Sequence, residues 1–407
     1  MKILKNCLLA AAIPTTILIM SSCTTSDKNA GGAGPFGPNS VRYKIEGLTP
    51  IGKDASGKEW RLGGFSGLQY LGTENGNYLF ASLTDRGPNA DEKEMPDGET
   101  HRPFLLPDYQ PRLVFFRVDP KAGRAFVTSE LPLKNTNGTP ITGRPNQPGD
   151  EMPVDMKGAI LPRDPNGIDA EGVAVAEDGT YWLGEEYGPS LLHFSKKGDL
   201  IERYSPGKGL PEALKNRKLN RGFEAVAMYK TSVFAMLQSP IPQKKSEKKT
   251  KPFNVRIVEF DASTKTTIGQ YLYVLDGDNH RIGDMIALPN RELLILEHDS
   301  KFGEKGFKKV YRAALGAASN LQDLTPEVAN SPLDGMDAAE LGKAQVAPVL
   351  KTEVVDLIKE KMTYTEKPEG LAMINESTLV IANDNDFGVF PGEGDTSYLL
   401  FVTVPKR

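Results

Sequence analysis

Carboxylate side chains recur beside short apolar stretches, in a pattern that could gather them into one site. In each repeat an acidic or small residue opens an apolar stretch, a turn follows, and a second apolar stretch ends in a polar cluster. Five segments follow this pattern: 66–86, 171–186, 224–238, 284–299 and 369–386. Each predicts an antiparallel hairpin, which places the start of its first strand beside the end of its second. A ring of such hairpins would collect the acidic residues at one mouth.

The acidic residues at this mouth offer the oxygen atoms that calcium prefers. The candidate metal ligands are Asp169, Glu171, Glu185, Glu186, Glu369, Asp384 and Asp386. Calcium takes about six to eight oxygen ligands, and carboxylates brought together without a cation repel one another. We therefore expect bound calcium, or else arginines interleaved with the acids. A third interpretation is structural, because each carboxylate could instead accept main-chain N–H groups of its own hairpin.

Four further residues are candidates for catalysis beside the carboxylates. Arg86 and Arg221 could each clamp phosphate oxygens through two parallel hydrogen bonds. Asp85, or His298 between two acidic neighbours, could position a water molecule or protonate a leaving group. The alternative for His298 is a histidine that only forms a hydrogen bond at the end of a strand.

The elements that must position these residues are mostly short strands. Asn75-Gly76 and Asp178-Gly179 lie at the middle of two repeats and are strong hairpin signals, because these residues tolerate positive φ. Four antiparallel strands per repeat predict an all-β fold, a β-propeller. We expect six blades, with seven as the alternative. Residues 42–45 are a candidate strand for closing the ring against strands from the other end of the chain.

Loop insertions interrupt the repeats at two places. The longer insertion covers about 132–168 and is rich in Pro, Gly and Asn. A second insertion, at about 313–347, contains most of the predicted helical material. Whether the first insertion covers the mouth as a lid is left open by the sequence.

The first 22 residues predict a secretory signal peptide rather than part of the fold. Lys2 and Lys5 precede an apolar stretch that is short for a membrane span, and small residues follow it. These small residues end on Cys23 in a pattern that resembles a bacterial lipobox, which implies that Cys23 is lipidated. The alternative is an ordinary cleaved signal in which Cys23 is incidental. Residues 23–40 predict a flexible tether, which leaves 41–407 as one domain.

These features together predict an exported protein of the bacterial cell envelope, in the outer membrane or periplasm. The membrane would be contacted through the lipid anchor only. The formal net charge of −4 gives no electrostatic reason to expect nucleic acid as a partner. Both cysteines lie in the leader, so residues 41–407 have neither a disulfide nor a thiolate metal site. We expect a monomer that acts on a small molecule.

Five short segments of the chain carry a family resemblance. They are residues 82–89, 169–174, 184–189, 221–225 and 368–372. Taken together they resemble the phytase-like family of exported bacterial proteins, which is also called the "esterase-like activity of phytase" family. The similarity extends from about residue 45 to residue 404. The resemblance implies a β-propeller and a calcium-assisted phosphoesterase. The Asp-Asp-Pro-Ala and Asn-Asn-Val-Asp motifs of the more distant β-propeller phytases are absent, so phytate itself is not implied.

Three functions are compatible with these residues. The first is a calcium-dependent phosphoesterase acting on a small-molecule phosphoester or ester. The second is a non-catalytic binding propeller of the envelope that recognises a glycan, a phosphorylated ligand or a protein. The third is a lactonase-type ester hydrolase whose metal has acidic and Asn ligands, for which Asn383 and Asn385 are candidates. The fold cannot choose among them, since function depends on the site.

Overall fold

The computed structural model describes residues 34–94, 98–242, 253–329, 331–390, 392 and 395–406. The predicted signal peptide at 1–22, Cys23 and the first part of the tether lie outside the described residues. In the described part the chain is mostly β-strands, and its α-helices α1 (Pro326–Ala329) and α2 (Ala338–Lys343) are short. None of the helices described has the length and apolar character needed to cross a membrane.

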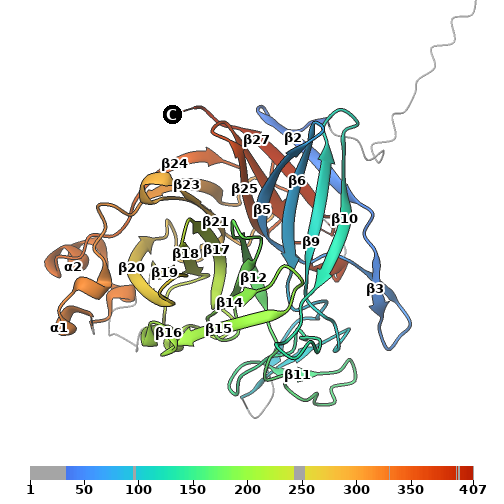
Figure 1. Ribbon diagram of the computed structural model, residues 1–407, viewed down its shortest axis with the longest axis horizontal. Helices are drawn as coiled ribbons and strands as arrows, with labels where there is room; N and C mark the ends of the chain where they lie inside the picture. The colour runs from blue at the N-terminus through green and yellow to red at the C-terminus, as the bar shows by residue number, and fades with distance from the viewer. Residues whose placement is uncertain are drawn as a thin grey trace, which may run out of the picture. The chain divides into compact units, whose positions relative to one another are not determined.

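The strands form blades of four antiparallel strands each, so the predicted all-β propeller is confirmed (Figure 1). Blade 1 contains β5 (Phe65–Glu74), β6 (Asn77–Thr84), β9 (Arg112–Asp119) and β10 (Arg124–Pro132). Blade 2 contains β12 (Ala170–Val175), β13 (Tyr181–Glu185), β14 (Ser190–Phe194) and β15 (Leu200–Pro206). Blade 3 contains β17 (Phe223–Tyr229), β18 (Ser232–Leu237), β19 (Asn254–Asp261) and β20 (Thr266–Val274). Blade 4 contains β21 (Arg281–Leu288), β22 (Glu292–His298), β23 (Lys308–Ala314) and β24 (Leu350–Asp356). Blade 5 contains β25 (Pro368–Asn375), β26 (Thr378–Asn383), β27 (Tyr398–Thr403) and β2 (Ser40–Glu46).

The described strands therefore make five blades, and the expectation of six is wrong. The inner strands contact one another in the order β5, β12, β17, β21 and β25, and β25 returns to β5, so five blades close the ring. Strand β2 does pair with β27, with Arg42 opposite Leu400, as the sequence suggested. It supplies the outer strand of blade 5 rather than part of an additional blade.

Every inner hairpin contains a β-bulge near its mouth end. In each case one residue of the first strand has no partner in the second: Gly67, Glu171, Glu224, Gly283 and Glu369. A bulge changes the direction in which its extra side chain points and is common next to active sites. Five equivalent bulges therefore place five equivalent residues around the centre of the ring.

The core lies between the blades, where apolar side chains of neighbouring sheets pack together. Trp182 of blade 2, for example, lies 5.8 Å between ring centroids from Phe260 of blade 3. Phe65 packs edge-on against Phe116 at 5.0 Å within blade 1. Burial of this extent accounts for a stable domain of this size without disulfides.

The two insertions both contain regular structure. The first includes β11 (Met152–Val154), which pairs with β8 (Thr100–Pro103), and β8 pairs with β7 (Lys93–Glu94), at the lower edge of the view in Figure 1. The second contains α1 and α2, as expected from the sequence. Its 3-10 turn is held to blade 3 by two hydrogen bonds of 2.8 and 2.7 Å from Arg256 to Asp334. The remaining strands are short: β1 (Gly34–Pro35), β3 (Pro50–Lys53), β4 (Glu59–Arg61) and β16 (Gly209–Leu210).

Candidate functional site

Three glutamates from three blades meet at the centre of the ring. Glu171, Glu224 and Glu369 each offer a carboxylate oxygen, and these oxygens all lie within 4.8 Å of one another. All three residues occupy the bulge position of their hairpins. Glu224 was not among the metal ligands predicted from the sequence, although it opens its repeat in the same way as Glu171. We call Glu171, Glu224 and Glu369 the central triad.

The central triad has no ion-pair partner among the described residues. Its hydrogen bonds are few: Gln238 Nε2 donates to Glu224 Oε2 at 2.7 Å, and Ser66 Oγ donates to Glu369 Oε2 at 3.4 Å. Within the described part of the chain, the buried Oε1 atoms of Glu224 and Gln238 have no hydrogen-bond partner. Burial, and then the neighbouring carboxylates, raises the pKa of Glu171 and Glu224 well above the usual range. The triad thus brings three buried carboxyl groups together without a direct ion pair among the described residues, although Lys367 and Arg281 lower the pKa of Glu369 from a greater distance.

A second acidic group shares Glu171 with the triad. Asp169, Glu171 and Glu186 also have carboxylate oxygens within 4.8 Å of one another. Arginines lie at the outer edge of this group, with Arg86 Nη1 3.3 Å from Asp169 Oδ2 and Arg221 Nη1 3.4 Å from Glu186 Oε1. Burial raises the pKa of Glu186 to about 8, against the opposing effect of Arg221. Arginines therefore interleave with the acids at the edge of the mouth, whereas the centre has only carboxylates.

The acids of blade 5 are paired with a lysine. Lys367 Nζ lies 3.1 Å from Asp384 Oδ2 and 2.5 Å from Asp386 Oδ1. Asp384 Oδ1 also accepts the main-chain N–H of Asp386 at 2.7 Å. Lys367 was not among the residues predicted from the sequence. Its position one residue before the fifth hairpin could have indicated that it lies near these acids. Asp384 and Asp386 thus have a cation of the protein itself, unlike the central triad.

Asp85 lies between these groups. Its Oδ1 accepts the N–H of Gly87 at 2.8 Å, and its side chain is buried. Burial raises the pKa of Asp85 well above the usual range, and the nearby carboxylates of Asp384 and Asp169 add to this effect. Such a carboxyl can retain a proton near neutral pH.

Glu185 differs from its expected orientation toward the mouth. It accepts main-chain N–H groups of Tyr187 at 3.0 Å and Gly188 at 2.9 Å, so its carboxylate turns back into its own blade. The register explains this, because Glu185 pairs with Ala170 while Glu171 is the unpaired bulge residue. Glu185, expected as a metal ligand, therefore has the structural role that the sequence analysis gave as the alternative.

Asp284 also departs from the repeat read in the sequence. The bulge of blade 4 falls on Gly283, where an added Cβ would lie 2.2 Å from the carbonyl oxygen of Pro368. Asp284 Oδ2 instead accepts the N–H groups of Leu68 at 3.0 Å and Leu371 at 2.7 Å. It therefore links blade 4 to the inner strands of blades 1 and 5.

His298 is fully buried at the end of β22. Its Nδ1 lies 3.0 Å from the main-chain oxygen of Asp299, and burial lowers its pKa to about 3. The imidazole is therefore neutral at physiological pH. His298 is therefore in the environment expected under the alternative, in which it only forms a hydrogen bond at the end of a strand.

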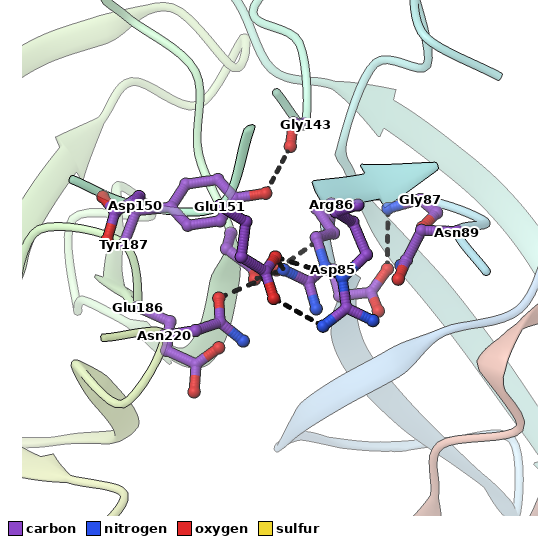
Figure 2. A network of polar contacts seen from close by, with 12 residues as sticks. Asp85, Arg86, Gly87, Asn89, Gly143, Asp150, Glu151, Glu186, Tyr187 and Asn220 are labelled. Atoms are coloured by element: carbon purple, nitrogen blue, oxygen red, sulfur yellow. Dashed lines mark hydrogen bonds and ion pairs between the residues drawn. The ribbon is translucent and has the colours of Figure 1, made fainter. Parts of the chain in front are cut away.

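The first insertion reaches the mouth and contacts Arg86 (Figure 2). Arg86 Nη1 lies 3.0 Å from Glu151 Oε2 and donates to Asn220 Oδ1 at 3.1 Å. Glu151 is 7% exposed. A residue of the insertion thus covers one of the two arginines predicted to hold phosphate.

The central carboxylates fit a hard divalent cation. Oxygens within 4.8 Å of one another can surround a single ion at calcium–oxygen distances of about 2.3–2.6 Å. The unpartnered Oε1 of Glu224 is buried and would gain a ligand interaction from such an ion. Because all the donors are oxygens, the set suits calcium or magnesium better than a soft metal.

One family model matches most of the chain, and several known proteins are similar to it. Residues 60–387 match the family model described as "Phytase-like: Esterase-like activity of phytase". An "Uncharacterized secreted protein" of Arthroderma benhamiae is 24% identical over 370 aligned residues, covering 67% of this chain and 70% of that protein. Among solved structures, PhoX of Pseudomonas fluorescens in complex with vanadate has a TM-score of 0.37 at 10% identity, covering 92% of this chain and 96% of that chain. Streptogramin B lyase has a TM-score of 0.34 at 12% identity, covering 91% of this chain and 100% of that chain.

Proposed function

The chain belongs to the phytase-like family, and from the geometry of its central triad we propose that it is a calcium-assisted phosphoesterase. The observation that carries the proposal is the convergence of three buried carboxylates from three blades without a cation of the protein. Structural stability does not require this arrangement, since like charges placed together in a buried position oppose folding. A bound cation would remove that opposition.

Two cation positions follow from the two acidic groups. One would use Glu171, Glu224 and Glu369, and the other would use Asp169, Glu171 and Glu186, so that Glu171 bridges them. When bound there, calcium would neutralise phosphate charge and lower the pKa of a water molecule. The metal-ligand roles of Glu185, Asp384 and Asp386 are less favoured, because their carboxylates already have donors within the protein.

The protein's own residues would hold the substrate and transfer a proton. Arg221 is partly exposed at the mouth and pairs with one oxygen of Glu186, which leaves N–H groups for phosphate oxygens. Arg86 would contribute a second guanidinium. Asp85, whose carboxyl pKa is raised, would keep its proton and donate it to the oxygen of the leaving group.

The test is a melting experiment combined with a substrate panel. Calcium should raise the melting temperature and a chelator should lower it, because an ion that binds only the folded state stabilises it. Phosphomonoesters and phosphodiesters should be hydrolysed only with calcium. Hydrolysis of lactones or simple esters alone would favour the lactonase-type hydrolase. A melting temperature that depends on calcium, without hydrolysis of any substrate, would favour the binding propeller. A melting temperature that is the same with calcium and with chelator would overturn the metal site.

We also propose export and anchoring through Cys23. The signal-like leader of this chain and the similarity to a secreted protein of Arthroderma benhamiae support export. A lipidated chain should partition with membranes, and Cys23→Ala should release it into the soluble fraction. Recovery of the unaltered protein in the soluble fraction, with a mature terminus other than Cys23, would contradict the anchor. We further propose that the substrate is a small-molecule phosphoester or ester rather than nucleic acid, and that the protein acts as a monomer.

A further inference from the structure

The carboxylate of Glu151 lies between two guanidinium groups at the edge of the mouth. Its Oε2 accepts from Arg86 Nη1 at 3.0 Å and from Arg102 Nε at 3.1 Å, and its Oε1 accepts from Arg102 Nη2 at 2.5 Å. Burial alone would raise the pKa of Glu151, but the two arginines outweigh it and lower the pKa to about 2, so these bonds hold a single anionic group in place. Two converging guanidinium groups are the arrangement by which proteins bind carboxylate and phosphate oxygens.

The anion at this position comes from the insertion rather than from a blade. Arg86 follows the inner hairpin of blade 1, and Arg102 lies in β8. Both arginines also have partners other than Glu151, since Arg86 Nη1 donates to Asn220 Oδ1 and Arg102 Nη1 donates to the main-chain oxygen of Ala90, each at 3.1 Å. Arg86 Nη1 is also 3.3 Å from Asp169 Oδ2, so the position next to it borders the second acidic group. An oxyanion that replaced Glu151 would contact the arginines beside the proposed cation sites.

We propose that Arg86 and Arg102 form a binding subsite for a phosphate group, which the chain itself fills with Glu151 until a ligand displaces it. This inference rests on the proposed function, because it identifies the group that a phosphoester substrate would place against Arg86. The exchange leaves no buried guanidinium unpaired, since one oxyanion replaces another. The adjoining Asp150 stays bound to Arg217 at 2.7 Å, so only the Glu151 side chain and its immediate backbone need to move.

The neighbouring backbone can accommodate this movement. Gly149 has a φ of 91°, and no atom lies within 4 Å of the place where its Cβ would be. The segment before Glu151 is therefore not packed against the rest of the protein at that point. The subsite would thus open by a local change, while the insertion remains attached through Asp150.

The experiment measures binding of inorganic phosphate by calorimetry in the presence of a chelator, so that neither calcium nor hydrolysis is involved. Glu151→Ala should bind phosphate at least about tenfold more tightly than the unaltered protein, because the competing carboxylate is gone. Glu151→Gln, which keeps the size of the side chain, should show a smaller gain in the same direction. Adding Arg86→Ala or Arg102→Ala to either variant should abolish the gain.

Glu92→Ala is the matched control. Glu92 Oε2 accepts from the same Arg102 at 2.8 Å and Glu92 also interacts with the Glu151 carboxyl, but Glu92 is exposed and forms no ion pair with Arg86 in the described part of the chain. It should leave phosphate affinity unchanged within about twofold, although the net charge changes equally. If neither folded Glu151 variant binds phosphate more tightly than Glu92→Ala does, the subsite proposal is overturned. Tighter phosphate binding without any calcium-dependent hydrolysis would retain the subsite and reject only the phosphoesterase.

Discussion

Glu224 and Glu297 are buried glutamates at the mouth ends of neighbouring blades, yet their surroundings are opposite. Glu297 has two donors on each carboxylate oxygen, at 2.7–2.8 Å. These donors are the main-chain N–H of Asp276, His280 Nδ1, the hydroxyl of Tyr273 and Lys351 Nζ. Glu224 has a single donor, Gln238 Nε2, and its Oε1 has no hydrogen-bond partner in the described residues.

The difference shows that burial and acidity do not by themselves identify a functional carboxylate. Glu297 pairs with Ile282 in the ladder, which is the position that Glu185 has in blade 2, and both are satisfied by groups nearby. Glu224 occupies a bulge, as Glu171 and Glu369 do, and these carboxylates meet without an ion pair to any residue that the structure describes. The small number of protein donors, together with the lack of a direct ion pair in the described residues, separates a site for a ligand from part of the scaffold.

The largest effect should come from exchanging the two glutamates for glutamine. Glu297→Gln should lower the free energy of unfolding by about 3–5 kcal/mol, because four donors lose a buried charged acceptor and Lys351 keeps only Asp276, at 2.6 Å, as an ion-pair partner. Glu224→Gln, unfolded by urea at pH 8 with a chelator, should lose no stability, since it removes a repelled charge. Equal losses in the two variants would mean that Glu224 belongs to the scaffold as Glu297 does.

The second prediction concerns pH in the absence of calcium. The pKa of Glu186 in the folded state is about 8, above its ordinary value of 4.5, so the folded protein binds more protons between these values. Stability should therefore be highest near pH 5 and should fall by about 3 kcal/mol toward pH 8. Saturating calcium should weaken or reverse this slope, because it binds the deprotonated carboxylates. A chelated protein whose urea midpoint stays constant from pH 5 to pH 8 would count against the acidic mouth.

Glu171→Gln tests the shared ligand. Because Glu171 contributes to both acidic groups, the change should raise the calcium dissociation constant at least about a hundredfold, or about 2.7 kcal/mol. Glu185→Gln is its control in the same hairpin and should leave the dissociation constant nearly unchanged. Calorimetric titration of both folded variants measures this directly. A similar loss of affinity in the control would return Glu185 to the set of metal ligands.

Asp284→Asn tests whether Asp284, which follows the bulge residue of blade 4, has a structural role rather than a metal-binding one. The variant should lose about 1–3 kcal/mol of stability, because one of two accepting oxygens becomes a donor facing main-chain N–H groups. Calcium affinity should not change, since Asp284 points to Leu68 and Leu371 rather than to the triad. Reduced calcium affinity at unaltered stability would place Asp284 in the site after all.

The smallest effect is expected for His298→Gln. General acid–base residues contribute roughly 100- to 10,000-fold to rate, whereas a buried residue outside the reaction should change kcat/KM by less than about tenfold. The neutral, fully buried imidazole of His298 favours the smaller change. Steady-state kinetics on a phosphoester that the unaltered protein hydrolyses would measure it. A loss beyond a hundredfold would restore His298 to a catalytic role.

Local signals were enough to predict the hairpins but not their register. Asn75 and Gly76 both have positive φ, as an Asn-Gly turn requires, so that hairpin could be located from the sequence. The bulge depends on contacts between blades, such as the close approach of Gly283 to Pro368, and these are remote in sequence. The repeat was therefore aligned one residue off in blades 1 and 4, which made Asp284 appear equivalent to Glu171.

Residues far from the hairpins were missed for the same reason. Nothing near Glu151 in the sequence indicates that an insertion returns to Arg86. Glu224 did carry a signal, because it opens the third repeat, but the repeat closes on Gln238 rather than on an acid. The blade number was overestimated because β2 completes the fifth blade instead of adding to a sixth.

The pairing of β2 with β27 also determines when the molecule can become complete. These strands lie near opposite ends of the sequence, so the ring cannot close until the last strand has been synthesised. Contacts between such distant segments require the loss of much chain entropy and slow the final folding step. Before β27 is made, four blades can form and the fifth cannot, and the edges of β26 and β2 that β27 will pair with stay exposed to wrong partners.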